Sequence, residues 1–444
     1  MSGLCSGCGV CTALCPTGAR TMVFDEQGGM FLPRPDLPSC TGCGICLKVC
    51  PFTPANPPTP TLTQRLYAAV PGVQHHDVLG YYLATHVGYS EAHRLTSASG
   101  GLATWLLEHL LSAGAVDAVL SVGPDAASPT LFNYRACRSA LEVRACSGSC
   151  YQPVHLGRVL GDVLRTEGRY AVVALPCVAR ALRLATVEDP RLRSRLVFVV
   201  GLVCGQMKSR HYAEYLCARC GGAWPPTRIA FRTKRPDRPA SDYACTLSWD
   251  GVGTEARTAE IGWTDGLDMA WSGRLFTLEA CDHCDDVFAE CADVALMDAW
   301  LPALSVDWRG GSIAIVRNHA LDALLRKGRQ SESLLLEDFA LPEVLASQGG
   351  VVRQKRALNP LYGKGSLTLR TLDASPGLAT RLDAWIGRNL RIQSRAAWAA
   401  ARGDLRRFNA ALRPLLLVVA VRSALRRVAS RLRSLMGAPT RWRG

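Results

Sequence analysis

The chain has 444 residues, enough for two or three domains, and 48 % of them are hydrophobic, which is ordinary for a globular protein. No apolar stretch approaches the roughly 20 residues that a transmembrane helix needs. The formal net charge is +14, but thirteen of the 51 basic residues and one of the 37 acidic residues lie from Arg391 onward. The rest of the chain is nearly neutral and has no basic stripe interleaved with aromatic residues, which excludes a nucleic-acid-binding core.

Eight of the nineteen cysteines lie in the first fifty residues and form one motif twice. The pattern C-x2-C-x2-C-x3-C-P is formed by Cys5, Cys8, Cys11 and Cys15, and again by Cys40, Cys43, Cys46 and Cys50. It is typical of proteins that bind two [4Fe–4S] clusters, in which the fourth cysteine of each run ligates the other cluster. We therefore predict one cluster on Cys5, Cys8, Cys11 and Cys50, and a second on Cys40, Cys43, Cys46 and Cys15. The segment resembles a bacterial two-cluster ferredoxin.

Zinc and disulfide bonds are the alternatives for these cysteines. Zinc sites usually pair two short cysteine units across a longer gap and often include histidine, whereas the first histidine here is His75. Disulfide bonds need an oxidising compartment, and residues 1–4 show neither the basic nor the apolar region of a secretion signal. We expect a cytoplasmic protein with iron–sulfur clusters.

The N-terminal module is predicted to occupy residues 1–52 and to contain a hairpin. Apolar segments at 21–24 and 30–32 flank the sequence Asp-Glu-Gln-Gly-Gly, which favours a turn. Residues 53–80 are predicted to form a linker, because five prolines between 51 and 60 stiffen the chain.

Apolar strands then alternate with helices. We predict strands at 116–122, 170–175, 196–203, 294–297 and 312–316, and helices at 102–113, from 178, at 209–216 and from 320. This alternation indicates an α/β body with a mostly parallel or mixed sheet, beside an α+β ferredoxin-like domain. Ligands of such sheets gather at the carboxyl ends of strands, where Cys177 and Cys204 both lie.

A second set of cysteines belongs to this body. Cys281 and Cys284 form a C-x2-C pair, which with Cys177 and Cys204 supplies four thiolates, enough for a third [4Fe–4S] cluster. The alternative is that these are ordinary buried cysteines of the core. A further pair, Cys217-x2-Cys220, is more simply explained as surplus thiols than as a metal site.

These stretches together resemble the coenzyme F420 hydrogenase/dehydrogenase beta-subunit family. The segments that carry the resemblance are 96–101 (TSASGG, followed by a helix), 148–151 (GSCY), 174–182 (ALPCVARAL), 200–205 (VGLVCG), 281–300 and 311–316 (GSIAIV). The resemblance divides the body into an N-terminal flavin-binding region, 81–165, and a C-terminal iron–sulfur and flavin region, 166–375.

The resemblance implies an iron–sulfur flavoprotein that binds FAD. It places Ser99, Gly100 and Gly101 in the FAD-binding loop, where a glycine-rich turn before a helix can present N–H groups to a pyrophosphate; a plain helix cap is the alternative. It also places Tyr151 at the flavin site; an ordinary half-buried tyrosine is the alternative. Three positions depart from the family pattern: Cys150 (commonly basic), Met297 (usually glycine) and Cys291 (usually apolar, here a competing ligand).

Residues 376–444 are predicted to be a helical, arginine-rich tail. Pro414 can begin a helix and Gly437 can end it. Within it Val421, Leu425, Val428, Leu432 and Leu435 form an apolar stripe, arginines cover the remaining arc, and Trp442 follows. Residues 412–436 are thus expected to contact either an anionic membrane surface, at the inner face of the membrane, or the body of the protein or an oligomer partner, with the arginines solvated.

The resemblance implies an oxidoreductase that passes electrons between the clusters and FAD and reduces or oxidises an organic substrate such as coenzyme F420. A redox partner protein or a small electron donor is then required. The alternative is an electron-relay subunit without a substrate of its own. The proton donor is not identified: His211, His283 and Asp298 lie near the motifs, but a solvated or core role is favoured for each, and Cys137, Cys146 and Cys245 receive no assignment.

Overall fold

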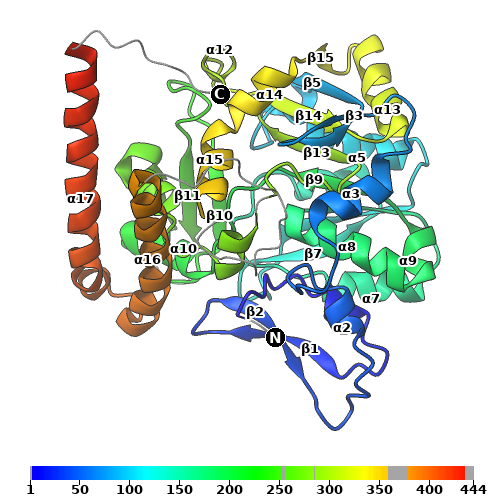
Figure 1. Ribbon diagram of the computed structural model, residues 1–444, viewed down its shortest axis with the longest axis horizontal. Helices are drawn as coiled ribbons and strands as arrows, with labels where there is room; N and C mark the ends of the chain where they lie inside the picture. The colour runs from blue at the N-terminus through cyan, green and yellow to red at the C-terminus, as the bar shows by residue number, and fades with distance from the viewer. Residues whose placement is uncertain (1–2, 252–255, 285, 359–377, 436–444) are drawn as a thin grey trace.

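The computed structural model describes residues 3–251, 256–284, 286–358 and 378–435. The architecture is α/β, as predicted: a large sheet flanked by helices, with the ferredoxin-like module at one end and a smaller sheet with the C-terminal helices at one side (Figure 1). Within the described ranges, no helix combines the length and the apolar character needed to cross a membrane.

The main sheet is mixed and has the strand order β15-β5-β14-β13-β9-β8-β6-β7. The central strands β13, β9, β8 and β6 run parallel, and the outer strands are antiparallel to their neighbours. The bounds are β5 Ala84–Tyr89, β6 Ala118–Pro124, β7 Phe132–Cys137, β8 Tyr170–Ala174, β9 Leu196–Leu202, β13 Val294–Asp298, β14 Ser312–Val316 and β15 Leu335–Asp338. The five predicted strands are therefore confirmed to within a few residues.

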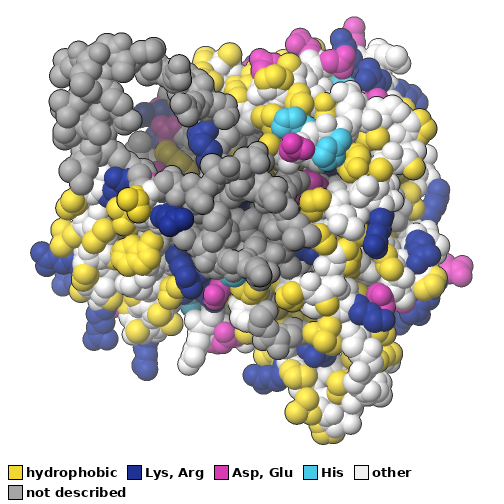
Figure 2. Space-filling view, viewed as in Figure 1, with side chains coloured by type: hydrophobic (Ala, Val, Ile, Leu, Met, Phe, Trp, Pro, Cys, Tyr) yellow, Lys and Arg dark blue, Asp and Glu magenta, His cyan; other side chains and the backbone are white. Residues whose placement is uncertain are grey.

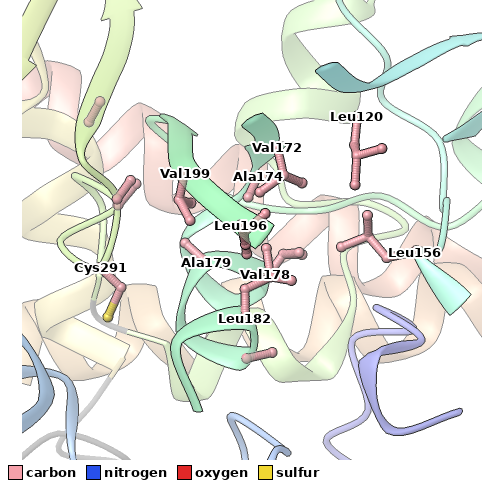
Figure 3. Packing of buried hydrophobic residues seen from close by; sticks show 14 of the residues in the cluster. Leu120, Leu156, Val172, Ala174, Val178, Ala179, Leu182, Leu196, Val199 and Cys291 are labelled. Carbon is pink, nitrogen blue, oxygen red and sulfur yellow. The ribbon is translucent and has the colours of Figure 1, made fainter. Parts of the chain in front are cut away.

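Helices cover both faces of this sheet because its central strands are apolar on both sides. Successive side chains of a strand point to opposite faces, so Val172 packs toward α7 and α8 while Ala171 packs toward α5 and α13. Figure 3 shows the first of these cores, between β8, β9 and α8. The covering helices are α5 Leu102–Ser112, α7 Gly157–Arg165, α8 Pro176–Glu188, α9 Pro190–Arg195 and α13 His319–Gln330.

Short helices connect these elements. They are α4 Glu91–Arg94, α6 Ala140–Ala145, η1 Trp263–Asp265, α11 Leu267–Ser272, η2 Glu279–His283, α12 Pro302–Ser305, α14 Leu341–Ser347 and α15 Gly349–Leu358. Four of them (α6, η1, α11 and α15) contribute residues to the cavity described below. The helix α6 begins at Ser139, whose hydroxyl and Glu142 form a reciprocal capping box.

The N-terminal module contains the predicted hairpin and is bound to the body. Strands β1 Arg20–Asp25 and β2 Met30–Pro35 pair antiparallel, beside the short helices α1 Val10–Ala13 and α2 Ile45–Lys48. The N–H of Leu156 donates to the carbonyl of Cys8 (2.8 Å). The guanidinium of Arg180, on α8, donates to the carbonyls of Pro51 (2.7 Å) and Pro57 (2.8 Å), so the proline-rich segment lies against the body. It leads into α3 Thr59–Tyr67, β3 Gln74–His76 and β4 Gly80–Tyr82.

A second, antiparallel sheet faces the main one across the cavity. Its strands are β10 Arg228–Thr233, β11 Ala244–Trp249 and β12 Arg257–Gly262, and it packs with α10 His211–Arg219, α16 Leu378–Ala401 and α17 Leu405–Leu435. The core between them contains stacked and edge-on aromatic rings of Tyr215, Phe276, Trp398 and Phe408. None of the predicted strands lies in this region.

The predicted start of the last helix at Pro414 is wrong. The helix α17 begins at Leu405, because Asp404 caps it by accepting from the N–H groups of Arg406 (2.8 Å) and Arg407 (3.1 Å). Pro414 lies inside the helix on its exposed side, where the carbonyl that it leaves without an N–H partner can face water. The side chains of the predicted stripe from Leu425 onward, and Trp442, lie outside the described residues.

Candidate functional site

A cavity of about 870 Å³ lies between the two sheets. The carboxyl ends of β8, β9 and β13 form one wall, the N-terminus of α5 a second, and Arg232 of β10 with residues 241–243 of the loop before β11 a third. Its volume falls in the range of about 300–1,000 Å³ that is usual for small-molecule and cofactor sites. The location follows from the topology, because the crevice at the carboxyl ends of parallel strands is where α/β folds bind ligands.

The predicted loop before α5 reaches this cavity. Ser99 and Gly101 line it, as do Ala103 and Thr104 of the first helical turn. Gly101 has a positive φ of 83° at the N-cap of α5. A side chain at Gly100 would meet the carbonyl oxygen of Gly88 at 2.7 Å. The backbone conformation and close packing of the loop therefore explain why glycine occupies positions 100 and 101. A phosphate bound in the cavity would contact the first turn of α5.

Lys234 holds this loop in place. Its Nζ donates to the carbonyls of Ser99 (2.8 Å), Arg309 (2.5 Å) and Arg94. Burial foremost, together with the nearby guanidinium groups of Arg232 and Arg94, lowers the pKa of Lys234 to about 8. The hydroxyl of Ser99 donates to the carbonyl of Gly311 (2.6 Å), which ties the same loop to the beginning of β14.

Another part of the cavity wall is aromatic and includes an ion pair between Arg232 and Asp298. Tyr151 lines it and packs its ring against Trp271, with the centroids 4.4 Å apart. Arg232 donates to both carboxylate oxygens of Asp298 (2.8 Å each), and its guanidinium lies over the rings of Tyr243 and Trp300. Rings and a charged pair together can bind a planar, polar molecule.

The four cysteines of the second set lie close together behind the cavity wall. They come from the first turn of α8 (Cys177), the loop just after β9 (Cys204), the helix η2 (Cys281) and the position just after η2 (Cys284). Burial raises the pKa of the Cys177 thiol well above its usual value, and the charges of Cys284, Cys204 and Cys281 raise it further. Cys204 itself lines the cavity. Four thiols that influence one another in this way are a ligand set of the kind that a [4Fe–4S] cluster uses.

Polar contacts position these cysteines. The N–H of Met207 donates to the sulfur of Cys281 (3.1 Å). The Nζ of Lys355, on α15, donates to the sulfur of Cys284 (3.5 Å) and to the carbonyl of Asp286 (2.9 Å). Burial would lower the pKa of Lys355, but the thiols, Cys284 foremost, hold it above its usual value. Sequence reasoning missed Lys355, because a single lysine in a helix usually faces solvent.

The first N-terminal set lies next to the body. Burial raises the pKa of Cys8, and the nearby thiols of Cys11, Cys5 and Cys50 raise it further. The structure thus brings Cys50 beside the first run of cysteines. Cys8 also lines the cavity, and it is among the groups that raise the pKa of Cys177.

The second N-terminal set lies farther out. Cys40 and Cys43 are exposed, and Cys15 and Cys46 are half-buried. The exposed side chain of Leu37 lies on the same segment of the module. The two N-terminal sets therefore differ in position: one adjoins the body and the other adjoins solvent.

Of the three candidate proton donors, Asp298 lines the cavity. The imidazole of His211 lies between the carboxylate of Glu214 (2.9 Å) and the carbonyl of Gln27 (3.0 Å), and so joins α10 to the N-terminal hairpin. His283 lies on η2, and burial lowers its pKa.

The remaining cysteines have other surroundings. Cys291 is fully buried among apolar side chains of the main core (Figure 3), and its principal electrostatic neighbours are Asp286, Arg180, Glu290 and Arg183. Cys150 and Met297 line the cavity, and burial raises the pKa of Cys150 to about 12. The sulfurs of Cys137 and Cys146 are 3.7 Å apart. Buried Cys245 has Cys217 and Cys220 as neighbours.

Sequence models of known families match most of the described chain. The model of the coenzyme F420 hydrogenase/dehydrogenase beta subunit N-terminus matches residues 85–161, that of its C-terminus matches residues 167–341, and a 4Fe–4S dicluster domain matches residues 4–53. No curated protein matches the chain. Among solved structures, it is similar to a chain from the xenon-derivatized F420-reducing [NiFe] hydrogenase complex of Methanosarcina barkeri. The identity is 14 % and the TM-score 0.48, over 64 % of this chain and 93 % of that one.

Proposed function

Because the chain belongs to the coenzyme F420 hydrogenase/dehydrogenase beta-subunit family, with a 4Fe–4S dicluster domain at its N-terminus, we propose that it is an iron–sulfur flavoprotein oxidoreductase. In this proposal the protein exchanges electrons between [4Fe–4S] clusters and FAD, and it reduces or oxidises an organic substrate such as coenzyme F420. The observation that carries the proposal is that Cys204, Cys8 and the N-terminus of α5 share the wall of one cavity. Cysteine thiols that can bind electron-carrying clusters and a helix N-terminus that can bind the phosphates of a dinucleotide thus line the same cavity.

The residues of the cavity fit FAD. The first turn of α5 offers backbone N–H groups to the pyrophosphate, and its loop is held by Lys234 and Gly311. Apolar and aromatic side chains, Tyr151 among them, supply flat walls for a ring system. When bound, a flavin supplies the junction between one-electron and two-electron chemistry, because it can hold one electron or two.

The order of the thiol sets supports an inward route. The set with Cys40 and Cys43 adjoins solvent, the set with Cys8 adjoins the body, and the set with Cys177 adjoins the cavity. We propose that the outer set receives a redox partner or small donor and that the inner sets connect it to the cavity. The arrangement is equally suited to the reverse direction of flow.

Metal and flavin analysis tests this function. Protein purified without oxygen is expected to contain about twelve iron atoms per chain, four for each of three clusters, together with bound FAD. Iron without any flavin would contradict the oxidoreductase and favour an electron-relay subunit that has no substrate of its own. Zinc in place of iron, in a colourless protein, would contradict both.

We further propose that residues 412–436 dock the protein on an anionic membrane surface. Exposed apolar side chains stand on α17 at Leu417, Val418 and Val421 and on α16 at Leu382 and Trp385. Figure 2 shows hydrophobic and basic side chains intermixed over this part of the molecule. Apolar contact combined with arginine charge is how interfacial helices bind anionic lipid.

Liposome flotation checks this docking. The full chain is expected to float with vesicles that contain anionic lipid and to remain in the bottom fraction of the gradient when the vesicles are neutral. A variant that lacks residues 412–444 should remain in solution with both. Equal recovery of the full chain and the truncated variant with anionic vesicles would exclude membrane binding. If the molecular mass of the full chain in solution rises with protein concentration, and that of the truncated variant does not, the helix forms an oligomer contact instead.

A further inference from the structure

One polar side chain of the cavity has no use in the protein itself. Gln152 lines the cavity and is 3 % exposed, and both its amide nitrogen and its amide oxygen lack a hydrogen-bond partner among the described residues. A buried amide that makes no hydrogen bond costs free energy, so native proteins rarely keep one without a role. The cavity is the space from which a partner can come.

The position of Gln152 is close to the predicted electron carriers along the chain. It follows Tyr151, which packs against the aromatic wall, and it precedes Leu156, whose N–H donates to the carbonyl of Cys8. Cys150 and Cys8 line the same cavity. The segment that carries the unpartnered amide therefore connects the aromatic side chains at Tyr151 with the N-terminal cysteine set that includes Cys8.

The chemistry of the amide selects a complementary ligand edge. A glutamine amide offers one acceptor and one donor side by side, in either order. The matching edge is an adjacent N–H and C=O in a planar ring, as in the pyrimidine part of the flavin isoalloxazine. A phosphate offers acceptors alone and a saturated apolar group offers neither, so neither ligand would satisfy both amide atoms.

We propose that Gln152 binds the pyrimidine edge of the flavin ring, with its oxygen accepting from the ring N3–H and its nitrogen donating to the neighbouring carbonyl. This inference rests on the proposed function, since it requires FAD in the cavity. It adds which part of the cavity wall the redox-active ring faces: the segment of Tyr151 and Gln152, near Cys150 and Cys8, while the first turn of α5 binds the pyrophosphate. Gln152 is thereby a binding and orienting residue for the ring.

The test is a flavin titration of the full-length protein with its clusters intact. FAD is added to flavin-depleted protein, and binding is followed by the quenching of flavin fluorescence. Gln152→Met keeps the size of the side chain and removes both hydrogen bonds, so we expect roughly ten- to hundred-fold weaker binding. Gln152→Glu, which can accept but not donate, should also bind more weakly. Gln64→Met, the same substitution on the exposed face of α3, should bind as the parent does.

A modified ligand separates a direct contact from a general disturbance. The parent protein is expected to bind N3-methylated FAD at least tenfold more weakly than FAD, whereas Gln152→Met should discriminate much less between the two. Parent-like FAD affinity in both Gln152 variants, or unchanged discrimination in Gln152→Met, would overturn the inference and leave the flavoprotein intact. A parent protein that binds no FAD at all would overturn the proposed function itself.

Discussion

Replacing Cys177 by serine is expected to lower the iron content from about twelve to about eight atoms per chain. Cys177 lies within the electrostatic reach of Cys204, Cys281 and Cys284, and serine is a poor substitute for a thiolate ligand of iron. The two N-terminal sets keep all their cysteines in this variant. Iron analysis and electron paramagnetic resonance of the reduced protein measure the loss, which should remove the signal of one cluster and preserve those of the other two.

Cys291→Ser is the matched control for this experiment. Cys291 is fully buried. Its neighbours are apolar side chains of the main core and charged groups, and the four cysteines of the second set are not among its principal electrostatic neighbours. We expect this variant to keep about twelve iron atoms. Loss of iron from Cys291→Ser with retention in Cys177→Ser would show that the ligand set has been assigned to the wrong cysteines.

Replacing Asp282 by asparagine is expected to destabilise the fold by about 3–5 kcal/mol. Its carboxylate accepts from the guanidinium of Arg274 (2.6 Å) and forms an ion pair with Arg391 of α16 (2.5 Å). All three side chains are no more than 1 % exposed. Removing the negative charge leaves two buried cations without their counter-charge, and burial makes such a charge costly. The apparent melting temperature, followed by circular dichroism, should fall markedly.

Asp237→Asn provides the comparison at the surface. Asp237 pairs with Arg238 (3.3 Å) where both side chains are largely exposed, and such pairs contribute about 0–1 kcal/mol. Its melting temperature should stay near that of the parent. Because Asp282 lies between Cys281 and Cys284, its variant should also lose iron from the third cluster more readily. Equal melting of the two variants would contradict the role given to the buried carboxylate.

The fold of the main body could be predicted largely from sequence. The strand at Leu196–Leu202 is a continuous apolar run, and a run of this kind is stable when helices bury both faces of the sheet. The small sheet β10–β12 escaped prediction, because its short strands carry charged residues such as Arg228 and Arg257 at their ends. Its stability comes from packing on α10 and α16, which are distant in sequence.

The start of α17 shows how one competing local signal misleads. Pro414 is a favourable first residue for a helix, and Asp404 is a favourable cap ten residues earlier. The cap prevails because Phe408 and Leu412 pack into the aromatic core of the small sheet. Tertiary burial therefore offsets the one hydrogen bond that the proline removes.

The iron–sulfur character of the N-terminal module could be read from sequence, because ligand spacing is a local property of the chain: the two cysteine runs from Cys5 to Cys50 predict two clusters without reference to the rest of the molecule. The tertiary structure alone decided the relations among the sites. It placed one run beside Cys177 and the other beside solvent, and it placed Lys355 at the sulfur of Cys284. It also left the amide of Gln152 without a partner at the cavity. Burial and contact between distant segments create these relations, and no spacing along the chain encodes them.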